Sequence, residues 1–174
     1  MHLRVSDGIY FEVGGTSTNI GVIRNGRPTV KYARVGGHET YVSSLDVRVI
    51  GIAGGSMVRV RDGKLVDVGP RSAHIAGLPY SAFANPGDIV DPSIELFQPK
   101  ADDPTDYIAV RVANGTRYAI TNTCAANVLG YAKPGLHAYG NPESAERAIA
   151  ALASLIGKSV EDTARAILDI ATDK

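Results

Sequence analysis

The chain is organised around the stretch Ile9-Tyr-Phe-Glu-Val-Gly-Gly-Thr-Ser-Thr-Asn-Ile-Gly-Val-Ile23. Its β-branched and aromatic residues are typical of two strands, and the Gly14-Gly15 pair between them permits a sharp turn because glycine lacks a Cβ atom. Thr16, Ser17 and Thr18 add hydroxyl and amide groups that suit phosphate oxygens. These residues alone leave two interpretations open: a phosphate-binding loop, and a hairpin turn whose hydroxyls bond to nearby backbone groups.

Length and composition predict a soluble globular protein. The 174 residues are 44% hydrophobic and 21% charged, with a formal net charge of zero, and we expect a single domain over residues 1–174. A neutral chain gives no reason to expect nucleic acid or a membrane surface as a partner, and no apolar run reaches the length of a membrane-spanning helix. A single cysteine and the lack of a signal-peptide pattern predict a cytoplasmic location.

Three dipeptides that favour tight hairpin turns predict a largely antiparallel, strand-rich first two thirds. They are Asn25-Gly26, Asp62-Gly63 and Asn114-Gly115, and each lies between two segments that suit strands. Residues 77–106 contain five prolines and little periodic pattern, so we expect a surface insertion there.

The last third is predicted to be helical. Asn122 or Thr123 is suited to cap a short helix. Asn141-Pro142 supplies a cap and a first-position proline for a second helix, which Gly157 ends, and Ser159 caps a third. Together these patterns predict a mixed α/β domain with an antiparallel-rich sheet and C-terminal helices.

Three glycine-containing blocks follow one another along the first part of the chain. They are Glu12-Val-Gly-Gly-Thr-Ser-Thr-Asn19, Ile50-Gly-Ile-Ala-Gly-Gly-Ser56 and Val68-Gly-Pro-Arg-Ser-Ala73. In this order they resemble the hydantoinase/5-oxoprolinase family (hydantoin utilization protein A and its relatives), within the actin/hexokinase/heat-shock ATPase superfamily. The resemblance implies one ribonuclease-H-like lobe of an actin-like ATPase, and it covers only part of a family member's length.

The resemblance also implies a nucleotide site with a metal ion. The residues that it assigns to ATP are Gly14, Gly15, Thr16, Ser17 and Thr18 at the phosphates, and Gly54, Gly55 and Ser56 across the cleft. Glu12 stands where the family has Asp, and the resemblance implies that it orients the attacking water or holds Mg²⁺ (or Mn²⁺) through water. Asp46 follows Leu45 as an aspartate follows a leucine in the family, and the resemblance implies that it is a buried catalytic carboxylate. The residues alone are equally consistent with an aspartate that caps a turn.

The implied activity is the ATP-dependent activation of an oxygen atom by phosphoryl transfer. A cyclic amide, hydantoin or 5-oxoproline, is then opened by hydrolysis, or a ketone is carboxylated, and the sequence does not separate these two outcomes. The implied partners are the small-molecule substrate, the remaining lobes of the parent chain and a second subunit.

Other interpretations stay open beside this one. Three positions depart from the family pattern: Glu12 and Asn19 each stand where the family has Asp, and Ala53 stands where it has Gly. These departures are also consistent with a non-catalytic lobe that serves in assembly. A sugar-kinase-like ATPase of the same superfamily is a further alternative. Cys124, at the start of a predicted helix, is either a nucleophile or a packing residue.

Overall fold

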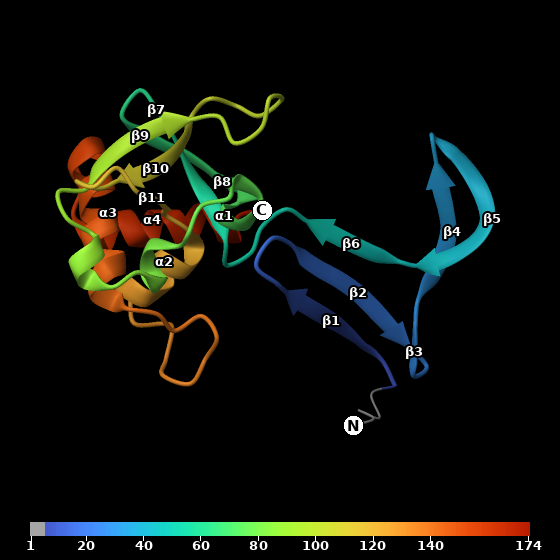
Figure 1. Cartoon of the computed structure of the whole chain (residues 1–174). Coiled ribbons are helices and arrows are strands. Elements are labelled where there is room, and N and C mark those ends of the chain that lie inside the picture. Colours follow the sequence, from blue (N-terminus) through green and yellow to red (C-terminus); the bar gives the residue numbers. More distant parts are fainter. Residues whose placement is uncertain (1–5) are drawn as a thin grey trace.

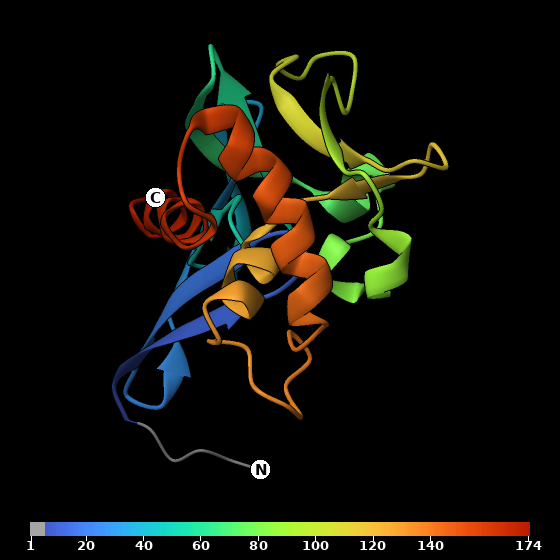
Figure 2. The same cartoon turned by 90° about the vertical axis from the view of Figure 1, so that its left-hand side faces the viewer.

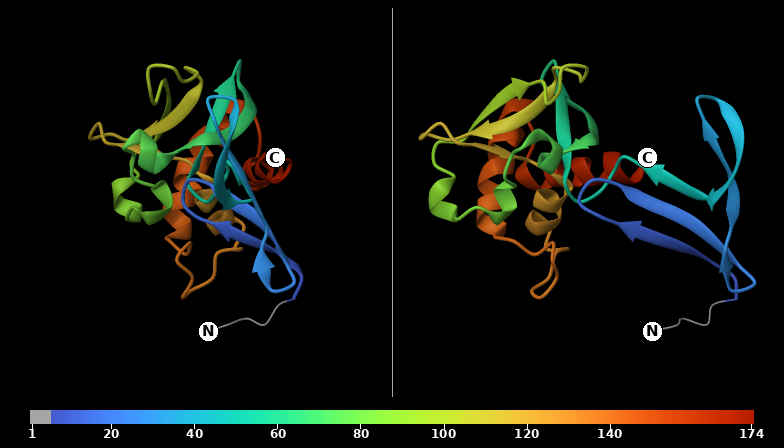
Figure 3. Two further views of the ribbon diagram at one scale, coloured as in Figure 1. Left: turned by 90° about the vertical axis from the view of Figure 1, so that its right-hand side faces the viewer. Right: turned by 45° about the vertical axis from the view of Figure 1, so that its right-hand side comes forward.

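The chain folds into an N-terminal group of strands and a C-terminal body of sheet and helices (Figure 1). The computed structural model describes residues 6–174. We call residues 8–50 the arm and residues 51–174 the body. The arm projects from the body, and its far end carries a separate two-stranded ribbon (Figure 3).

The arm is built from antiparallel strands. They are β1 (Gly8–Val13), β2 (Thr18–Arg24), β3 (Arg27–Pro28), β4 (Val30–Val35), β5 (His38–Leu45) and β6 (Val47–Ile50). Strand β2 pairs with β1, β3 and β6, whereas β4 and β5 form the ribbon. The predicted turn at Asn25-Gly26 is confirmed, with both residues at positive φ. The strand after it is short because Pro28 has no N–H to continue the ladder.

The body contains a five-stranded antiparallel sheet. Its strands are β7 (Ser56–Arg61), β8 (Lys64–Ser72), β9 (Ser93–Phe97), β10 (Tyr107–Arg111) and β11 (Arg117–Ala119). The order is β11-β10-β7-β8, and β9 also pairs with β10. The Asp62-Gly63 turn between β7 and β8 is confirmed, with φ values of 52° and 68°.

Helices follow and flank this sheet. They are α1 (Ala73–Ala76), α2 (Asn122–Val128), α3 (Pro142–Ile156) and α4 (Val160–Thr172), with short 3₁₀ turns η1 (Ser81–Phe83) and η2 (Pro86–Asp88). The predicted caps at Asn141 and Ser159 are confirmed, because each side chain accepts hydrogen bonds from the following backbone N–H groups. Gly157 ends α3 at φ 67°. The three C-terminal helices were predicted, but the cap of α2 was wrong: Thr121 is the N-cap residue, without a side-chain cap hydrogen bond, and Asn122 and Thr123 lie within the helix. No helix among residues 6–174 is long and apolar enough to cross a membrane.

The core lies between one face of the body sheet and helices α2, α3 and α4. Figure 2 shows α3 standing upright beside α4, which is viewed end-on. Fully buried side chains come from both layers: Val58, Ile108, Val110 and Ile120 from the sheet, and Ile149, Leu152 and Ile167 from the helices. Each such aliphatic side chain stabilises the fold by about 1.5–3 kcal/mol relative to exposure.

Residues 77–106 are more regular than the predicted surface insertion. They include β9, which pairs with β10 along its whole length, and they bury Ala82 and Ile89 in the core. Prolines stand at the borders of these short elements, Pro86 at the start of η2 and Pro92 just before β9. The short elements are too brief to show periodicity, which is why the sequence indicated only an irregular excursion.

Candidate functional site

The glycine blocks meet where the arm joins the body. The N–H of Gly55 donates to the carbonyl oxygen of Gly15 over 2.9 Å. The hydroxyls of Thr16 and Ser72 lie 3.1 Å apart. These contacts bring together the three blocks that the family resemblance singled out, although Thr16 and Ser72 are 56 positions apart along the chain.

Two threonine hydroxyls hold the same junction from either side. Thr18 Oγ1 donates to the carbonyl of Ile52 over 2.7 Å. Thr123, at the start of α2, donates from both its N–H and its hydroxyl to the carbonyl of Gly54, each over 2.9 Å. We call the resulting arrangement of residues 14–18, residues 54–55 and Thr123 the glycine cradle.

The β1–β2 loop leaves several N–H groups available within the cradle. The Gly14 N–H donates to the Ser17 carbonyl over 3.0 Å and closes the turn. The N–H groups of Gly15, Thr16 and Ser17 have no hydrogen-bond partner among residues 6–174. Successive unpaired N–H groups in a turn form a concavity that suits an anionic oxygen.

Close packing explains why glycine occupies positions 54 and 55. A Cβ on Gly54 would lie 2.9 Å from the Thr123 hydroxyl, and a Cβ on Gly55 would overlap the Gly15 carbonyl and the Tyr80 hydroxyl. Neither residue has positive φ, so the requirement is for space and not for an unusual backbone conformation.

Ser56 points inward in this arrangement. Its side chain is fully buried, and its Oγ accepts from the N–H of Ala53 over 2.9 Å. Asn122, which the sequence assigned only to helix capping, donates from its side-chain amide to the Ala53 carbonyl over 2.8 Å. The hydroxyl of Ser56 and the amide of Asn122 therefore fix the shape of the glycine block.

Glu12 lies beside the cradle on the exposed part of β1. It pairs across the sheet with Asn19, whose side-chain amide donates to Glu12 Oε2 over 2.9 Å. An aspartate at position 19 would place a second carboxylate against Glu12, so asparagine leaves a single negative charge there. Among residues 6–174, no group of three or more His, Cys, Asp or Glu side chains is arranged to hold a metal ion.

Asp46 is not part of the cradle. It links β5 to β6, at the opposite end of β6 from Gly51. Its carboxylate lies 2.8 Å from Lys31 Nζ and is about half exposed, whereas the family resemblance implied a buried carboxylate. The backbone explains the difference, because Asp46 donates its N–H to Thr29 at the edge of the ribbon.

Cys124 lies in α2 and is buried in the core. Its Sγ lies 3.1 Å from the Ser81 hydroxyl and 3.4 Å from the Thr121 hydroxyl. A fully buried thiol among hydroxyls and aliphatic side chains favours the packing interpretation over a nucleophile.

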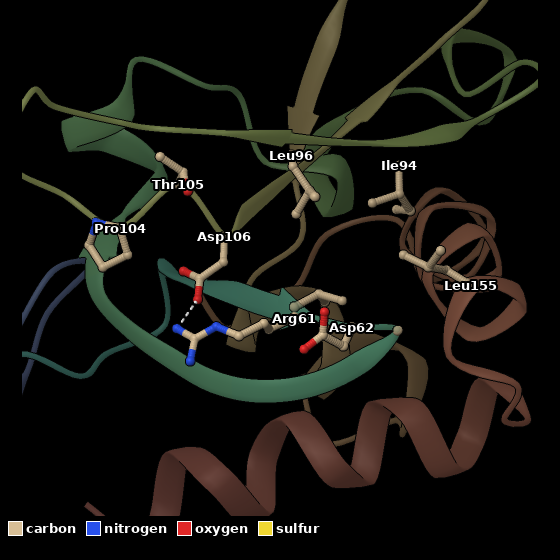
Figure 4. Close-up of a pocket in the computed structure, with 10 residues that line it drawn as sticks. Arg61, Asp62, Ile94, Leu96, Pro104, Thr105, Asp106 and Leu155 are labelled. Atoms are coloured by element: carbon tan, nitrogen blue, oxygen red, sulfur yellow. Dashed lines mark hydrogen bonds and ion pairs between the residues drawn. The ribbon is translucent and has the colours of Figure 1, made fainter.

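One hollow in the body lies away from the cradle, at the other end of β7 (Figure 4). It has a volume of about 510 Å³ and is lined by apolar side chains together with Arg61, Thr105 and Asp106. Asp106 accepts from Arg59 and Arg61, each over 2.7 Å. The Asp106 carboxylate is thus already paired with two arginines, and none of the three glycine blocks lines this hollow. We therefore place the candidate site at the cradle.

Comparison with known proteins agrees with the glycine blocks. The chain matches the family model described as hydantoinase/oxoprolinase over residues 1–174. A nucleotide-free structure of acetone carboxylase, from work on ATP-dependent acetone carboxylation, superposes with a TM-score of 0.60 at 19% sequence identity. The match covers 94% of this chain and 20% of that one, so the chain spans about a fifth of that protein. No curated protein sequence matches the chain significantly.

Proposed function

Because the chain belongs to the hydantoinase/oxoprolinase family, we propose that it is one actin-like lobe of a larger ATP-dependent enzyme and supplies part of its phosphate-binding site. The observation that carries this proposal is the glycine cradle. It presents the unpaired N–H groups of Gly15, Thr16 and Ser17 beside a glycine block whose Gly55 holds the loop in place. Preorganised N–H donors of this kind stabilise the charge on a transferring phosphoryl group.

The residues present suit a nucleotide with its metal ion. Gly15, Thr16 and Ser17 would contact the phosphates through their unpaired backbone N–H groups. The Thr16 and Thr18 hydroxyls already bond to Ser72 and Ile52 and hold the loop in place. Mg²⁺ in nucleotide sites is commonly held by one or two carboxylates, with water and phosphate oxygens completing its shell. Glu12 supplies one carboxylate, of which the hydrogen bond from Asn19 occupies a single oxygen.

The first candidate reaction is the opening of a cyclic amide such as hydantoin or 5-oxoproline. ATP, when bound, supplies the phosphoryl group that activates the amide oxygen. The cradle would hold the phosphates in line with that oxygen and neutralise their charge. Glu12 would orient the metal-bound water or the attacking water.

Carboxylation of a ketone is the second candidate. The fold resembles that of acetone carboxylase, whose reaction is ATP-dependent, and the same phosphate contacts would serve activation of an enol oxygen. The two candidates predict different stimulation of ADP release by the intact enzyme. A cyclic amide alone stimulates the hydrolase, whereas a ketone stimulates the carboxylase only together with bicarbonate.

An amide-NMR titration with Mg-ATP tests the phosphate site directly. We expect saturable shifts of the Gly14, Gly15, Thr16 and Gly54 signals, while Gly115 in a distant hairpin stays unchanged. Mg²⁺ with adenosine, which lacks phosphates, is the matched control and should leave the same signals in place. Absence of these shifts both in this chain and in the intact enzyme would overturn the proposal.

A further inference from the structure

The side chain of Tyr80 lies against the glycine cradle, although neither the sequence blocks nor the family resemblance points to it. A Cβ on Gly15 would lie 3.6 Å from the Tyr80 hydroxyl, and a Cβ on Gly55 would overlap the same oxygen. The phenol oxygen therefore sits over both glycines, on the side where either residue would carry a side chain.

The backbone of Tyr80 is anchored to the body sheet. Tyr80 forms a parallel bridge with Ala119, and the Ala119 N–H donates to the Pro79 carbonyl over 2.8 Å. The ring also packs against Phe83, with 5.4 Å between ring centroids. These contacts fix the position of the hydroxyl relative to the cradle without using the hydroxyl itself.

The Tyr80 hydroxyl is available as a donor. It has no hydrogen-bond partner among residues 6–174, and it faces the loop whose Gly15, Thr16 and Ser17 N–H groups are also unpaired. Partial burial, and next the nearby Cys124, raises the pKa of Tyr80 above its usual value near 10. The phenol therefore keeps its proton at neutral pH.

From this geometry we propose that the Tyr80 hydroxyl donates a hydrogen bond to a phosphate oxygen of the nucleotide held by the Gly15–Ser17 N–H groups. The inference rests on the proposed function, and it adds to the cradle a side-chain donor from the body. In this arrangement the loop of the arm and Tyr80 of the body donate hydrogen bonds to the same phosphate group from two sides.

The Tyr80→Phe variant tests this donor because it removes only the hydroxyl. In the amide-NMR titration with Mg-ATP, we expect the variant to bind about tenfold to a hundredfold more weakly than the unaltered chain, as for the loss of a hydrogen bond to a charged group. Tyr118→Phe is the matched control, since Tyr118 lies near Tyr80 but away from the glycines, and its affinity should not change. Equal affinity of Tyr80→Phe and the unaltered chain would overturn the inference and leave the proposed phosphate site standing.

A second measurement separates ligand contact from a structural role. With ¹³Cζ-labelled tyrosine, Mg-ATP should shift the Tyr80 signal and move its titration to higher pH, because a bound phosphate disfavours the phenolate. A Tyr80 signal that does not respond while the cradle N–H groups do would also overturn the inference. If the cradle N–H groups respond neither in this chain nor in the intact enzyme, both proposals fail together.

Discussion

Asp106 lies among arginines at the outer end of β7, with its side chain 11% exposed. The hydrogen bond from Arg59, and next that from Arg61, lowers the pKa of Asp106 against the opposing effect of burial. The folded-state pKa therefore lies below the unfolded value of about 3.9. Asp106 contributes its full stabilisation above that pH, and the contribution is lost as the pH falls through the folded-state pKa.

Asp106→Asn should lower the free energy of unfolding by about 2 kcal/mol at pH 7, since it removes hydrogen bonds between charged partners. Urea unfolding at several pH values checks this, and the difference from the unaltered chain should shrink below about pH 4. Asp62→Asn, at an exposed turn, is the control and should change little. A difference that stays constant down to pH 2 would contradict the ion-pair explanation.

Gly55→Ala tests the close contact between arm and body. The new Cβ would overlap the Gly15 carbonyl and the Tyr80 hydroxyl, so we expect a loss of about 1–3 kcal/mol of stability from overpacking. Gly87→Ala is a suitable control, because a Cβ there meets no atom within 4 Å and the φ is not positive. Thermal unfolding of both variants measures the effect. If Gly55→Ala is as stable as the unaltered chain, the contact between arm and body accommodates the extra methyl group and the overpacking prediction is wrong.

Glu12→Gln removes the carboxylate proposed to hold the metal. With Mn²⁺ and ATP, the unaltered chain should show paramagnetic broadening of the Asn19 side-chain amide, which bonds to Glu12. We expect the variant to lose most of this broadening while keeping its fold, because Glu12 is exposed. Asp46→Asn is the control, since that carboxylate pairs with Lys31 away from the cradle; it should leave the broadening intact.

At the level of the elements, local signals predicted the turns and helix ends well. Asn141 and Gly157 bracket α3 as expected because each acts on its own neighbours in sequence. The turn at Asn114-Gly115 shows the limit of such signals. It does join β10 to β11, but only Gly115 has positive φ, because Arg111 pairs with Arg117 and leaves a longer loop between them.

Asn141→Ala should shorten or loosen the start of α3. The side chain accepts hydrogen bonds from the N–H groups of Glu143 and Ser144, over 3.0 and 3.2 Å, and losing such a cap costs about 1 kcal/mol. Chemical denaturation measures the loss. Asn141→Ser keeps an acceptor at the same position and should restore most of the stability, whereas equal losses in both variants would point to another cause.

At the scale of the whole molecule, the sequence predicted only those parts of the candidate site that are contiguous blocks of residues. Residues 14–18 and 54–55 stand out as glycine-rich segments, and the structure brings them into contact. Tyr80 did not stand out because a single residue carried to the cradle by tertiary folding leaves no local pattern. Asp46 stood out by resemblance, yet the ribbon carries it away from the cradle.

The arm leaves many large apolar side chains in contact with solvent. On one face of β1, Ile9, Phe11 and Val13 are each about two thirds exposed, and Tyr41 in the ribbon is fully exposed. Large exposed apolar patches in proteins commonly serve as contact surfaces for other protein segments.

The hydrogen bonds that join arm and body involve the β1–β2 loop and the first residue of β2. Gly55 donates to Gly15, Thr18 donates to Ile52, and the Thr16 and Ser72 hydroxyls bond to each other. The segment that ties the arm to the body is therefore the same segment that carries the unpaired N–H groups of the cradle. Any ligand of the loop that changes the affinity of the arm for a protein partner must, by thermodynamic reciprocity, have its own affinity changed by that partner by the same factor. In this arrangement the attachment of the arm and the binding of a phosphate to the loop depend on the same few residues.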